Sequence, residues 1–421
     1  MGSRWLRQRA GVLAETNFRR FYTGYVTSLF GSSMSAVAVA FAVLDSGKHA
    51  TGLGYVFAAG VVPQVLVLPV AGAVADRFGR RRVMLAADTL RCATQGALAG
   101  AVLTGRPALW VFVLLAWLGG TGEGFFTAAR DALTVEIAPR GQLVNANAMY
   151  GLARSATRIA GPAVGGVLVA LAGSGVVVAV DAGSYAVSVL ALALLRLPHR
   201  AATQDGNTAP GGPGLCQMLW RDMAEGWAEL RSRTWLWAVT VQFAFFNLIT
   251  WAPWMLLGPV VAHAYLGGAA VWGLIMAAQG AGAIAAGLFA LGRKPRRPMV
   301  VATVGTFCYA LPDLPMALHA PAGWVAAAAF GCGAGSATSG IFGGTAVQQQ
   351  VPPELLARVN ALSLFPAFGI GVIGYAIDGP LYAAFGPAVV FGVGAAYGLL
   401  SSAAMLTLRS IRSVAWTEKD G

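Results

Sequence analysis

Apolar residues run through this chain in long continuous blocks, separated by short polar or glycine-rich breaks. Each block holds about 20 residues or more, the length at which an α-helix crosses the hydrocarbon core of a bilayer. The blocks do not alternate apolar with polar positions, as the strands of a membrane β-barrel do. The pattern predicts an all-α polytopic membrane protein with twelve transmembrane helices, at residues 19–44, 52–75, 83–104, 108–134, 144–172, 174–196, 234–262, 268–291, 299–319, 322–349, 358–382 and 386–409.

One long polar segment divides these helices into two groups of six. It opens with the linker-like run T-Q-D-G-N-T-A-P-G-G-P-G and ends with apolar and charged residues at helical spacing, which indicates an amphipathic surface helix. We therefore expect an amino-terminal bundle over residues 1–200, a cytoplasmic linker with an amphipathic helix over 201–232, and a carboxy-terminal bundle over 233–421. The halves also repeat, because Pro139 and Asn147 recur as Pro352 and Asn360.

Composition and charge support the same class. The 421 residues are 57% hydrophobic and 11% charged, and the net charge is +12. Of the 29 Lys and Arg residues, three lie inside apolar blocks (Arg91, Arg154 and Arg158) and two in the outer turns (Lys48 and Arg106). The others gather on one side, which the positive-inside rule makes cytoplasmic. This one-sided charge indicates no nucleic-acid partner. Because the number of predicted helices is even, both termini are expected in the cytoplasm, and the apolar blocks predict membrane lipid around the helices. Four cysteines without paired spacing indicate neither a disulfide framework nor a metal site.

A short cationic turn between the second and third predicted helices carries the motif G-x-x-x-D-R-x-G-R-R, from Gly72 to Arg81. This motif resembles the signature between helices 2 and 3 of the major facilitator superfamily of secondary transporters. The resemblance implies two pseudo-symmetric six-helix bundles and a cytoplasmic gate built on this turn. The expected gating residues are Gly72, Asp76, Arg77, Gly79 and Arg80, together with Arg130 and Asp131 at the end of the fourth helix. Asp76 is expected to face a helix amino terminus, that of the eleventh helix near Asn360, where a carboxylate is stabilised.

Further motifs resemble the twelve-helix drug:proton antiporter group that includes siderophore and macrolide exporters. Gly161, Pro162, Gly165 and Gly166 match the core of the antiporter signature in helix 5, although Thr157 stands where that signature has a glycine. Relatives also often carry an acidic residue after the glycine in helix 1, where this chain has Gly31-Ser32-Ser33. Proton uptake is therefore expected elsewhere.

Ionisable residues inside apolar helices are functional candidates, because an unpaired charge in the bilayer is unfavourable. The proton-coupling candidates are Glu123, Arg154, Arg158 and Asp181. Arg154 and Arg158 lie four residues apart on one helical face, and either is expected to pair with Glu123. The alternative is a permanent ion-pair strut between two helices, and Asp181 serves packing as readily as proton transfer.

Other acidic residues are expected nearer the membrane surfaces. Asp88 and Arg91 are expected to lie at shallow depth, close to the basic turn, and to form a structural or gating network with Arg130 and Asp131. The alternative for this pair is contact with substrate. Asp45, Asp313 and Asp378 fall toward the outer ends of their helices and are expected to be solvated.

The seventh predicted helix combines amides and aromatic rings with two prolines. Its substrate-cavity candidates are Gln242, Phe246, Asn247, Trp251 and Trp254, although any one of these side chains can equally serve packing. No P-loop, zinc-protease or nucleophile-elbow motif occurs, so we expect a transporter rather than an enzyme, with the proton gradient as energy source and no cofactor.

The predicted function is therefore export of a small amphipathic compound, such as a drug, antibiotic or siderophore, by proton antiport in a bacterial inner membrane. A monomer is expected. The alternatives are proton-coupled uptake or facilitated transport of a small metabolite, and a lipid-handling or non-transporting member of the fold.

Overall fold

The computed structural model describes residues 12–137, 142–195, 224, 227–293 and 295–415. Within these residues the regular structure is helical and no strand occurs. Ten of the described helices are long and apolar enough to cross a membrane. The twelve expected crossings fit this result for two reasons. Helix α4, with five charged residues, is not among the ten, and α15 joins two predicted helices across a break at Gly386.

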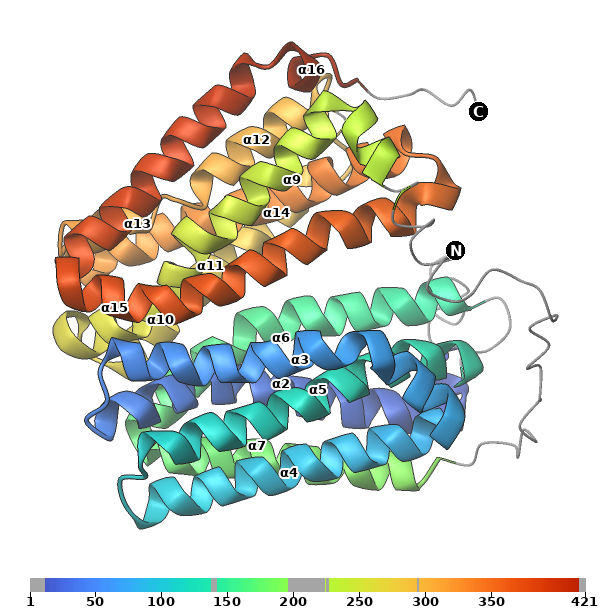
Figure 1. Ribbon diagram of the computed structural model, residues 1–421, viewed down its shortest axis with the longest axis vertical. Coiled ribbons are helices and arrows are strands. Elements are labelled where there is room, and N and C mark those ends of the chain that lie inside the picture. Colours follow the sequence, from blue (N-terminus) through green and yellow to red (C-terminus); the bar gives the residue numbers. More distant parts are fainter. Residues whose placement is uncertain (1–11, 138–141, 196–223, 225–226, 294, 416–421) are drawn as a thin grey trace. The chain divides into compact units, whose positions relative to one another are not determined.

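The chain forms two compact units (Figure 1). Unit 1 comprises residues 1–197, 255–280 and 375–386, and unit 2 comprises 198–254, 281–374 and 387–421. The predicted linker at residues 201–232 lies mostly outside the described residues; its described end, residues 227–232, is helical. The predicted division of the chain into two bundles at this linker therefore stays a prediction. In the structure, two segments that follow the linker, residues 255–280 and 375–386, belong to unit 1.

Six helices make up most of unit 1: α2 (Thr16–Asp45), α3 (Ala50–Phe78), α4 (Arg80–Thr104), α5 (Leu109–Ile137), α6 (Leu143–Ala172) and α7 (Ser174–Ala193). Helix α4 packs against α5 and α7, α7 packs also against α2, and α2 packs also against α6. The turn between α3 and α4 is a single residue, Gly79, whose φ of 88° is accessible to glycine at little cost. A cluster of buried aromatic rings, including Phe18, Tyr25 and Phe126, fills one end of this bundle.

Unit 2 begins with α9 (Thr234–Phe246), which continues as the π-helical turn η1 (Asn247–Trp251). The chain then crosses between the units within α10 (Ala252–Val261), α11 (Ala269–Ala290) and α15 (Pro353–Thr407). A second π-helical turn, η2 (Ala262–Leu266), belongs to unit 1. The predicted helix at 299–319 is two helices, α12 (Pro298–Cys308) and α13 (Asp313–Ala317), separated by a turn. Helices α14 (Ala322–Gln350) and α16 (Arg409–Arg412) complete the unit.

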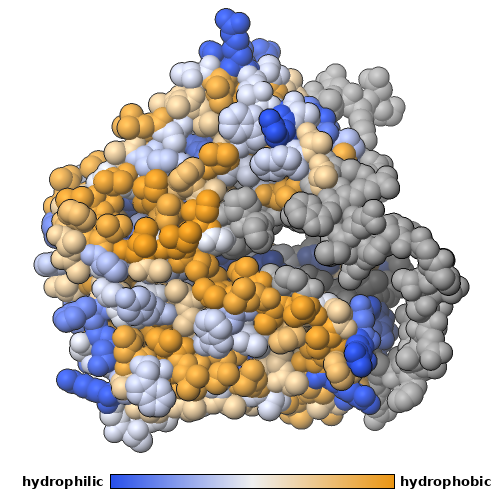
Figure 2. Space-filling model, in the orientation of Figure 1, coloured by the Kyte–Doolittle hydropathy of each residue, from blue (hydrophilic) through white to orange (hydrophobic). Residues whose placement is uncertain are grey.

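Large apolar side chains are exposed along the outer surfaces of many helices. Leu66, Trp110, Leu171, Leu288 and Phe289 are each more than 60% exposed. Figure 2 shows hydrophobic residues spread over much of the visible face of the helices. So much exposed apolar surface is unfavourable in water and suits contact with lipid chains. The chain is therefore a multi-pass membrane protein.

Candidate functional site

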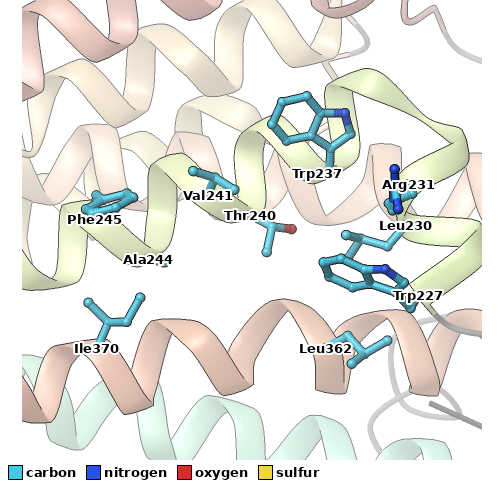
Figure 3. Close-up of a pocket in the computed structure, with 10 residues that line it drawn as sticks. All are labelled: Trp227, Leu230, Arg231, Trp237, Thr240, Val241, Ala244, Phe245, Leu362 and Ile370. Carbon is cyan, nitrogen blue, oxygen red and sulfur yellow. The ribbon is translucent and has the colours of Figure 1, made fainter. Parts of the chain in front are cut away.

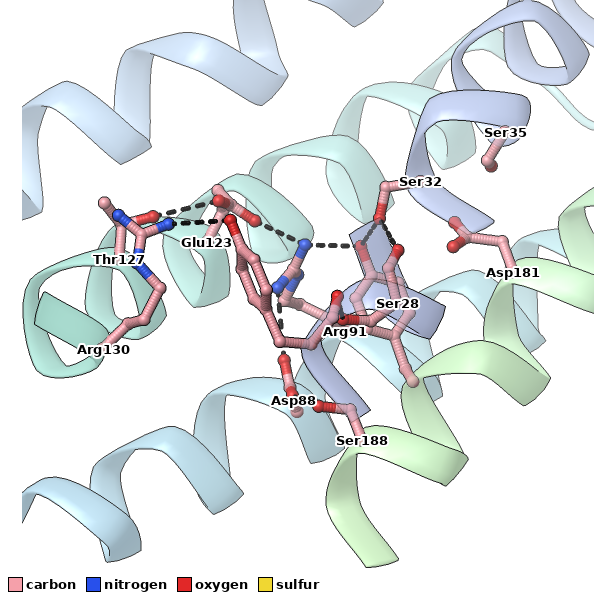
Figure 4. A network of polar contacts seen from close by, with 12 residues as sticks. Ser28, Ser32, Ser35, Asp88, Arg91, Glu123, Thr127, Arg130, Asp181 and Ser188 are labelled. Carbon is pink, nitrogen blue, oxygen red and sulfur yellow. Dashed lines mark hydrogen bonds and ion pairs between the residues drawn. The ribbon is translucent and has the colours of Figure 1, made fainter. Parts of the chain in front are cut away.

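A buried arginine organises the polar interior of unit 1. Arg91 on α4 is 8% exposed, and its guanidinium contacts the carboxylate of Glu123 on α5 and lies 3.2 Å from that of Asp88. It also donates a hydrogen bond of 2.6 Å to the hydroxyl of Tyr185 on α7. The guanidinium carbon lies 4.2 Å from the centre of the Tyr185 ring. The charge of Arg91 is thus compensated by two carboxylates and a ring face (Figure 4).

The two carboxylates differ in their access to water. Asp88 is fully buried and accepts a hydrogen bond of 2.5 Å from Ser188 on α7. The side chain of Glu123 is 35% exposed and accepts a hydrogen bond of 3.0 Å from Thr127. Both carboxylates contact the guanidinium of Arg91. Glu123 is the accessible end of the network.

A second buried carboxylate, Asp181 on α7, extends the polar interior. Its Oδ2 accepts a hydrogen bond of 2.9 Å from the amide of Gln95 on α4. A β carbon on Gly31 of α2 would collide with Asp181 and with Ser184, so glycine at this position allows α7 to approach α2 closely. Ser32, the next residue, is hydrogen bonded to the hydroxyl of Tyr185 at 2.7 Å. Hydrogen bonds therefore connect α2, α4, α5 and α7 (Figure 4).

Two expectations about these charges are wrong. Glu123 pairs with Arg91 instead of Arg154 or Arg158, both of which are exposed. Asp88 and Arg91 are buried in the bundle and not shallow. Asp88, Arg91 and Gln95 follow one another at intervals of three and four residues, so they share the face of α4 that packs on α5 and α7. This spacing could have shown from the sequence that the three polar side chains lie on one face of α4. Which residues of α5 and α7 they contact could be known only from the packing of the helices.

The cationic turn holds its own contacts in unit 1. Asp76 and Arg80 form an ion pair of 3.2 Å, in which the Asp76 side chain is 67% exposed. Arg80 also lies 3.8 Å from Glu136 near the end of α5, a partner that the sequence did not indicate. Arg81 donates hydrogen bonds to the carbonyls of Leu192 and Ala193 at the end of α7. The turn thus fastens α3, α4, α5 and α7 at one end of the bundle.

The other expected gating residues are placed as follows. Gly72 and Arg77 are exposed, and Arg130 lies with its guanidinium 3.4 Å from the Tyr25 hydroxyl and over that ring. The side chains of Asp131 and Asn360 lie outside the described residues. The predicted contact between Asp76 and the helix near Asn360 stays a prediction.

The antiporter-like motif of α6 serves close packing. A β carbon on Gly161 would collide with Ser33 of α2, and one on Gly165 would collide with the backbone of Met34. A β carbon on Gly166 would likewise collide with the backbone of Gly273 in α11. Small residues at this spacing let helix backbones approach one another.

The substrate-cavity candidates of the seventh predicted helix lie mostly in the interior of unit 2. Gln242 is buried and donates from its amide to Ser401 at 3.3 Å. Phe246 and Trp251 both contact the ring of Tyr309, Trp254 is 2% exposed, and the Asn247 amide donates to a carbonyl of its own helix. Gln242 thus contacts α15, and the rings of Phe246 and Trp251 contact the turn that follows α12. The pocket described next is lined by other residues.

A pocket of about 520 Å³ lies in unit 2 between α9, the helical residues before it and α15 (Figure 3). Its lining is largely apolar, with two indoles, a phenyl ring and one cation. The lining residues are Trp227, Leu230, Arg231, Trp237, Thr240, Val241, Ala244, Phe245, Leu362 and Ile370. This volume suits a drug-sized molecule. Sequence reasoning missed the pocket because it favoured the other face of the same helix.

Three acidic residues were expected to be solvated, and only one of them is. The Asp45 side chain is 56% exposed and lies 3.1 Å from His263 of η2, within unit 1. Asp313 and Asp378 are 1% and 2% exposed. The expectation failed because the distance of a residue from a helix end says nothing about which face of the helix is covered. Among the residues that the structure describes, no group of His, Cys, Asp and Glu side chains is arranged to hold a metal ion.

The model of the Major Facilitator Superfamily matches residues 21–374 of this chain. Macrolide efflux protein A of Streptococcus pyogenes is 24% identical over 258 residues, which are 60% of this chain and 61% of that protein. Multidrug efflux pump Tap of Mycolicibacterium fortuitum is 32% identical over 207 residues, which are 48% of this chain and 49% of the pump. The alignments thus span between about half and three-fifths of these relatives.

Solved transporter structures share the fold. The nucleoside transporter NupG has a TM-score of 0.67 at 14% identity and covers 94% of this chain and 98% of its own. A bacterial homologue of the iron transporter ferroportin, in an inward-facing state, has a TM-score of 0.66 at 14% identity, with the same coverage. At this identity the likeness shows the fold alone. Because the family model matches most of its length, the chain belongs to the Major Facilitator Superfamily of membrane transporters.

Proposed function

We propose that this chain exports a small amphipathic compound in exchange for protons, by a cycle that exposes the binding site to each side of the membrane in turn. The relatives named macrolide efflux protein A and multidrug efflux pump Tap support export, and the family supports transport over catalysis. The membrane is that of a bacterial cell, with both termini in the cytoplasm. The proton gradient supplies the energy, and no cofactor takes part.

The observation that carries the proposal is the network of Asp88, Arg91 and Glu123. Two carboxylates contact one guanidinium in the interior of unit 1, and a third, that of Asp181, lies in the same polar interior and accepts a hydrogen bond from Gln95. Glu123 is the member that water reaches. Protonation of Glu123 removes the ion pair between α4 and α5, and Arg91 then keeps only its ion pair with Asp88 on the same helix. A proton thereby changes which helices are held together.

The pocket beside α9 is the candidate substrate site. Aromatic and aliphatic side chains give affinity for an apolar ring system, while Arg231 and the hydroxyl-bearing Thr240 orient polar groups. The expected helix 7 residues, Phe246, Trp251 and Trp254 among them, stay candidates for the same cavity in another conformation. Exchange between conformations requires movement of the two predicted bundles, with Asp76, Arg77 and Arg80 biasing the cytoplasmic gate.

The test uses purified protein in vesicles with an imposed pH gradient and a fluorescent amphipathic substrate. Wild-type protein is expected to move substrate against the proton flow, toward the compartment with more protons. Glu123→Gln keeps the size of the side chain but cannot exchange a proton. It is expected to abolish the response to the pH gradient while leaving substrate binding and folding intact.

Glu15→Gln is the matched control, because Glu15 is an exposed carboxylate ahead of α2 and outside the network. Full gradient-driven transport by Glu123→Gln refutes the assignment. Transport of substrate together with protons identifies an uptake symporter, and transport without proton movement identifies a facilitator. Absence of substrate-dependent proton flux in wild-type protein, with tolerance of Asp76→Asn, identifies a non-transporting or lipid-handling member.

A further inference from the structure

Asp313, the first residue of α13, is buried in unit 2. It is 1% exposed, and neither of its side-chain oxygens has a hydrogen-bond partner among the described residues. Between Arg297 and Glu354 the sequence contains no Lys or Arg, and Asp313 is the only Asp or Glu. Chain neighbours therefore supply no cation to balance a charge at this position.

The elements packed around Asp313 supply none either. Helix α13 contacts α14, and its carboxyl lies against α15 at Gly394, next to the carbonyl of Ile249 in η1. No Asp, Glu, Lys, Arg or His occurs in η1, in α14 or in the part of α15 from residue 387 onward. The titratable side chains on these elements and beside α13 are Tyr397, Cys332, Tyr309, Cys308 and His319. Of these, His319 alone can carry a positive charge, and it lies beyond the end of α13.

Two glycines on α15 make room for this carboxyl and for the turn before it. A β carbon on Gly394 would collide with Oδ2 of Asp313 and crowd the Ile249 carbonyl, and one on Gly398 would collide with Ala310. The hydroxyl of Thr250 donates to the Gly394 carbonyl at 3.4 Å, which ties η1 to the same point of α15. The carboxyl is therefore held between a π-helical turn, a kind of element frequent at functional sites, and a helix backbone that approaches closely.

A charged carboxylate in such surroundings is strongly disfavoured, whereas the neutral acid is tolerated. We propose that Asp313 is a proton-binding site of unit 2, occupied in this conformation and emptied when α13 moves away from α15. Helix α13 has only five residues, and in the proposed cycle movement of this short segment brings the carboxyl to water. Binding of the proton stands on this geometry alone, while its use in transport rests on the proposed proton coupling.

The experiment is infrared spectroscopy of the purified full-length protein, recorded as difference spectra over a range of pH. A protonated carboxyl group has a carbonyl band separate from that of a carboxylate. Wild-type protein is expected to show such a band near neutral pH, and Asp313→Asn is expected to lack part of it. Asp45→Asn is the control, because that carboxyl is 56% exposed, and it should leave the band unchanged.

Three further variants, one of them a control, keep the test decisive if Asp313→Asn folds poorly. Asp313→Glu retains the acid but moves it, so the band should shift. Gly394→Ala should shift it as well, whereas Gly398→Ala, which crowds Ala310 on the same face, should not. An identical band in wild-type, Asp313→Asn and Asp313→Glu proteins overturns the proposal.

The proposed function fails separately, in the vesicle assay of wild-type protein. If both proposals hold, substrate-induced proton release measured with a pH-sensitive dye falls in Asp313→Asn relative to Asp45→Asn.

Discussion

Replacement of Arg91 by methionine is the sharpest perturbation of unit 1. Methionine fills a similar space and keeps the apolar stem, but it removes the guanidinium that contacts Glu123, Asp88 and Tyr185. Glu123 is partly exposed and can be solvated. Asp88 is fully buried and keeps only the hydrogen bond from Ser188. The variant therefore leaves one carboxylate in the bundle without a cation.

The expected loss of stability follows from the burial of the Asp88 carboxylate, which no longer has a cation beside it. Removal of one partner from a buried ion pair costs about 3–5 kcal/mol, because the remaining charge stays desolvated. The matched control is Arg80→Met, which breaks the pair with Asp76, whose side chain is 67% exposed, and the 3.8 Å contact with Glu136. Arg80 itself is 33% exposed, so neither contact is fully buried. An exposed pair contributes about 0–1 kcal/mol. Arg91→Met should thus lower the free energy of unfolding by several kcal/mol more than Arg80→Met does.

A second substitution separates the orphaned charge from lost packing. Asp88→Asn placed in the Arg91→Met background removes the buried charge while keeping the shape of the side chain. The double variant is expected to recover a large part of the stability, since neighbouring groups of one network are not additive. Thermal inactivation half-lives in detergent give the comparison without requiring reversible unfolding. The reasoning is refuted if Arg91→Met is no less stable than Arg80→Met, or if the double variant is no better than Arg91→Met alone.

The remaining predictions concern packing, an exposed ion pair and the pocket. Gly31→Ala should destabilise unit 1 by about 1–3 kcal/mol through overpacking, measured by thermal inactivation, whereas Gly96→Ala, which has open space, should be neutral or stabilising. Equal effects would contradict the close approach of α7 to α2. His263→Gln should lower the thermal stability by less than about 1 kcal/mol, because both members of the pair with Asp45 are exposed. A loss of several kcal/mol would contradict the exposure of this pair. Trp237→Ala should weaken binding of a fluorescent amphipathic substrate about tenfold, and Trp324→Ala, 70% exposed and outside the pocket, should not. Unchanged affinity in Trp237→Ala would exclude the pocket as the binding site.

The fold was predicted from the apolar blocks and from the cationic turn. The block over residues 52–75 is found as α3, and the block over 174–196 is found as α7, because the length of an apolar run directly sets how much helix can cross a bilayer. The motif from Gly72 to Arg81 identified the family that the family model confirms. The break at residues 309–312, between α12 and α13, was missed because the surrounding run is apolar throughout.

The site was predicted less well than the fold. Glu123 lies within a helix of unit 1, as expected, but its partner was sought on α6 and lies on α4. Its role in proton coupling stays a prediction. Asp313 was taken as solvated, and it is enclosed. The candidate pocket lies on the face of α9 opposite to the one expected.

By itself, the sequence determined where helices form, which turn is cationic and which superfamily the chain belongs to, because these follow from local hydropathy and from short motifs. The tertiary structure decided which face of each helix is covered and which charges meet. Arg91 finds Glu123 because α4 packs on α5, and Asp313 loses contact with water because Gly394 admits it against α15. Pairing and burial depend on the rotation of helices about their axes, and that rotation is set by contacts between residues far apart in the chain.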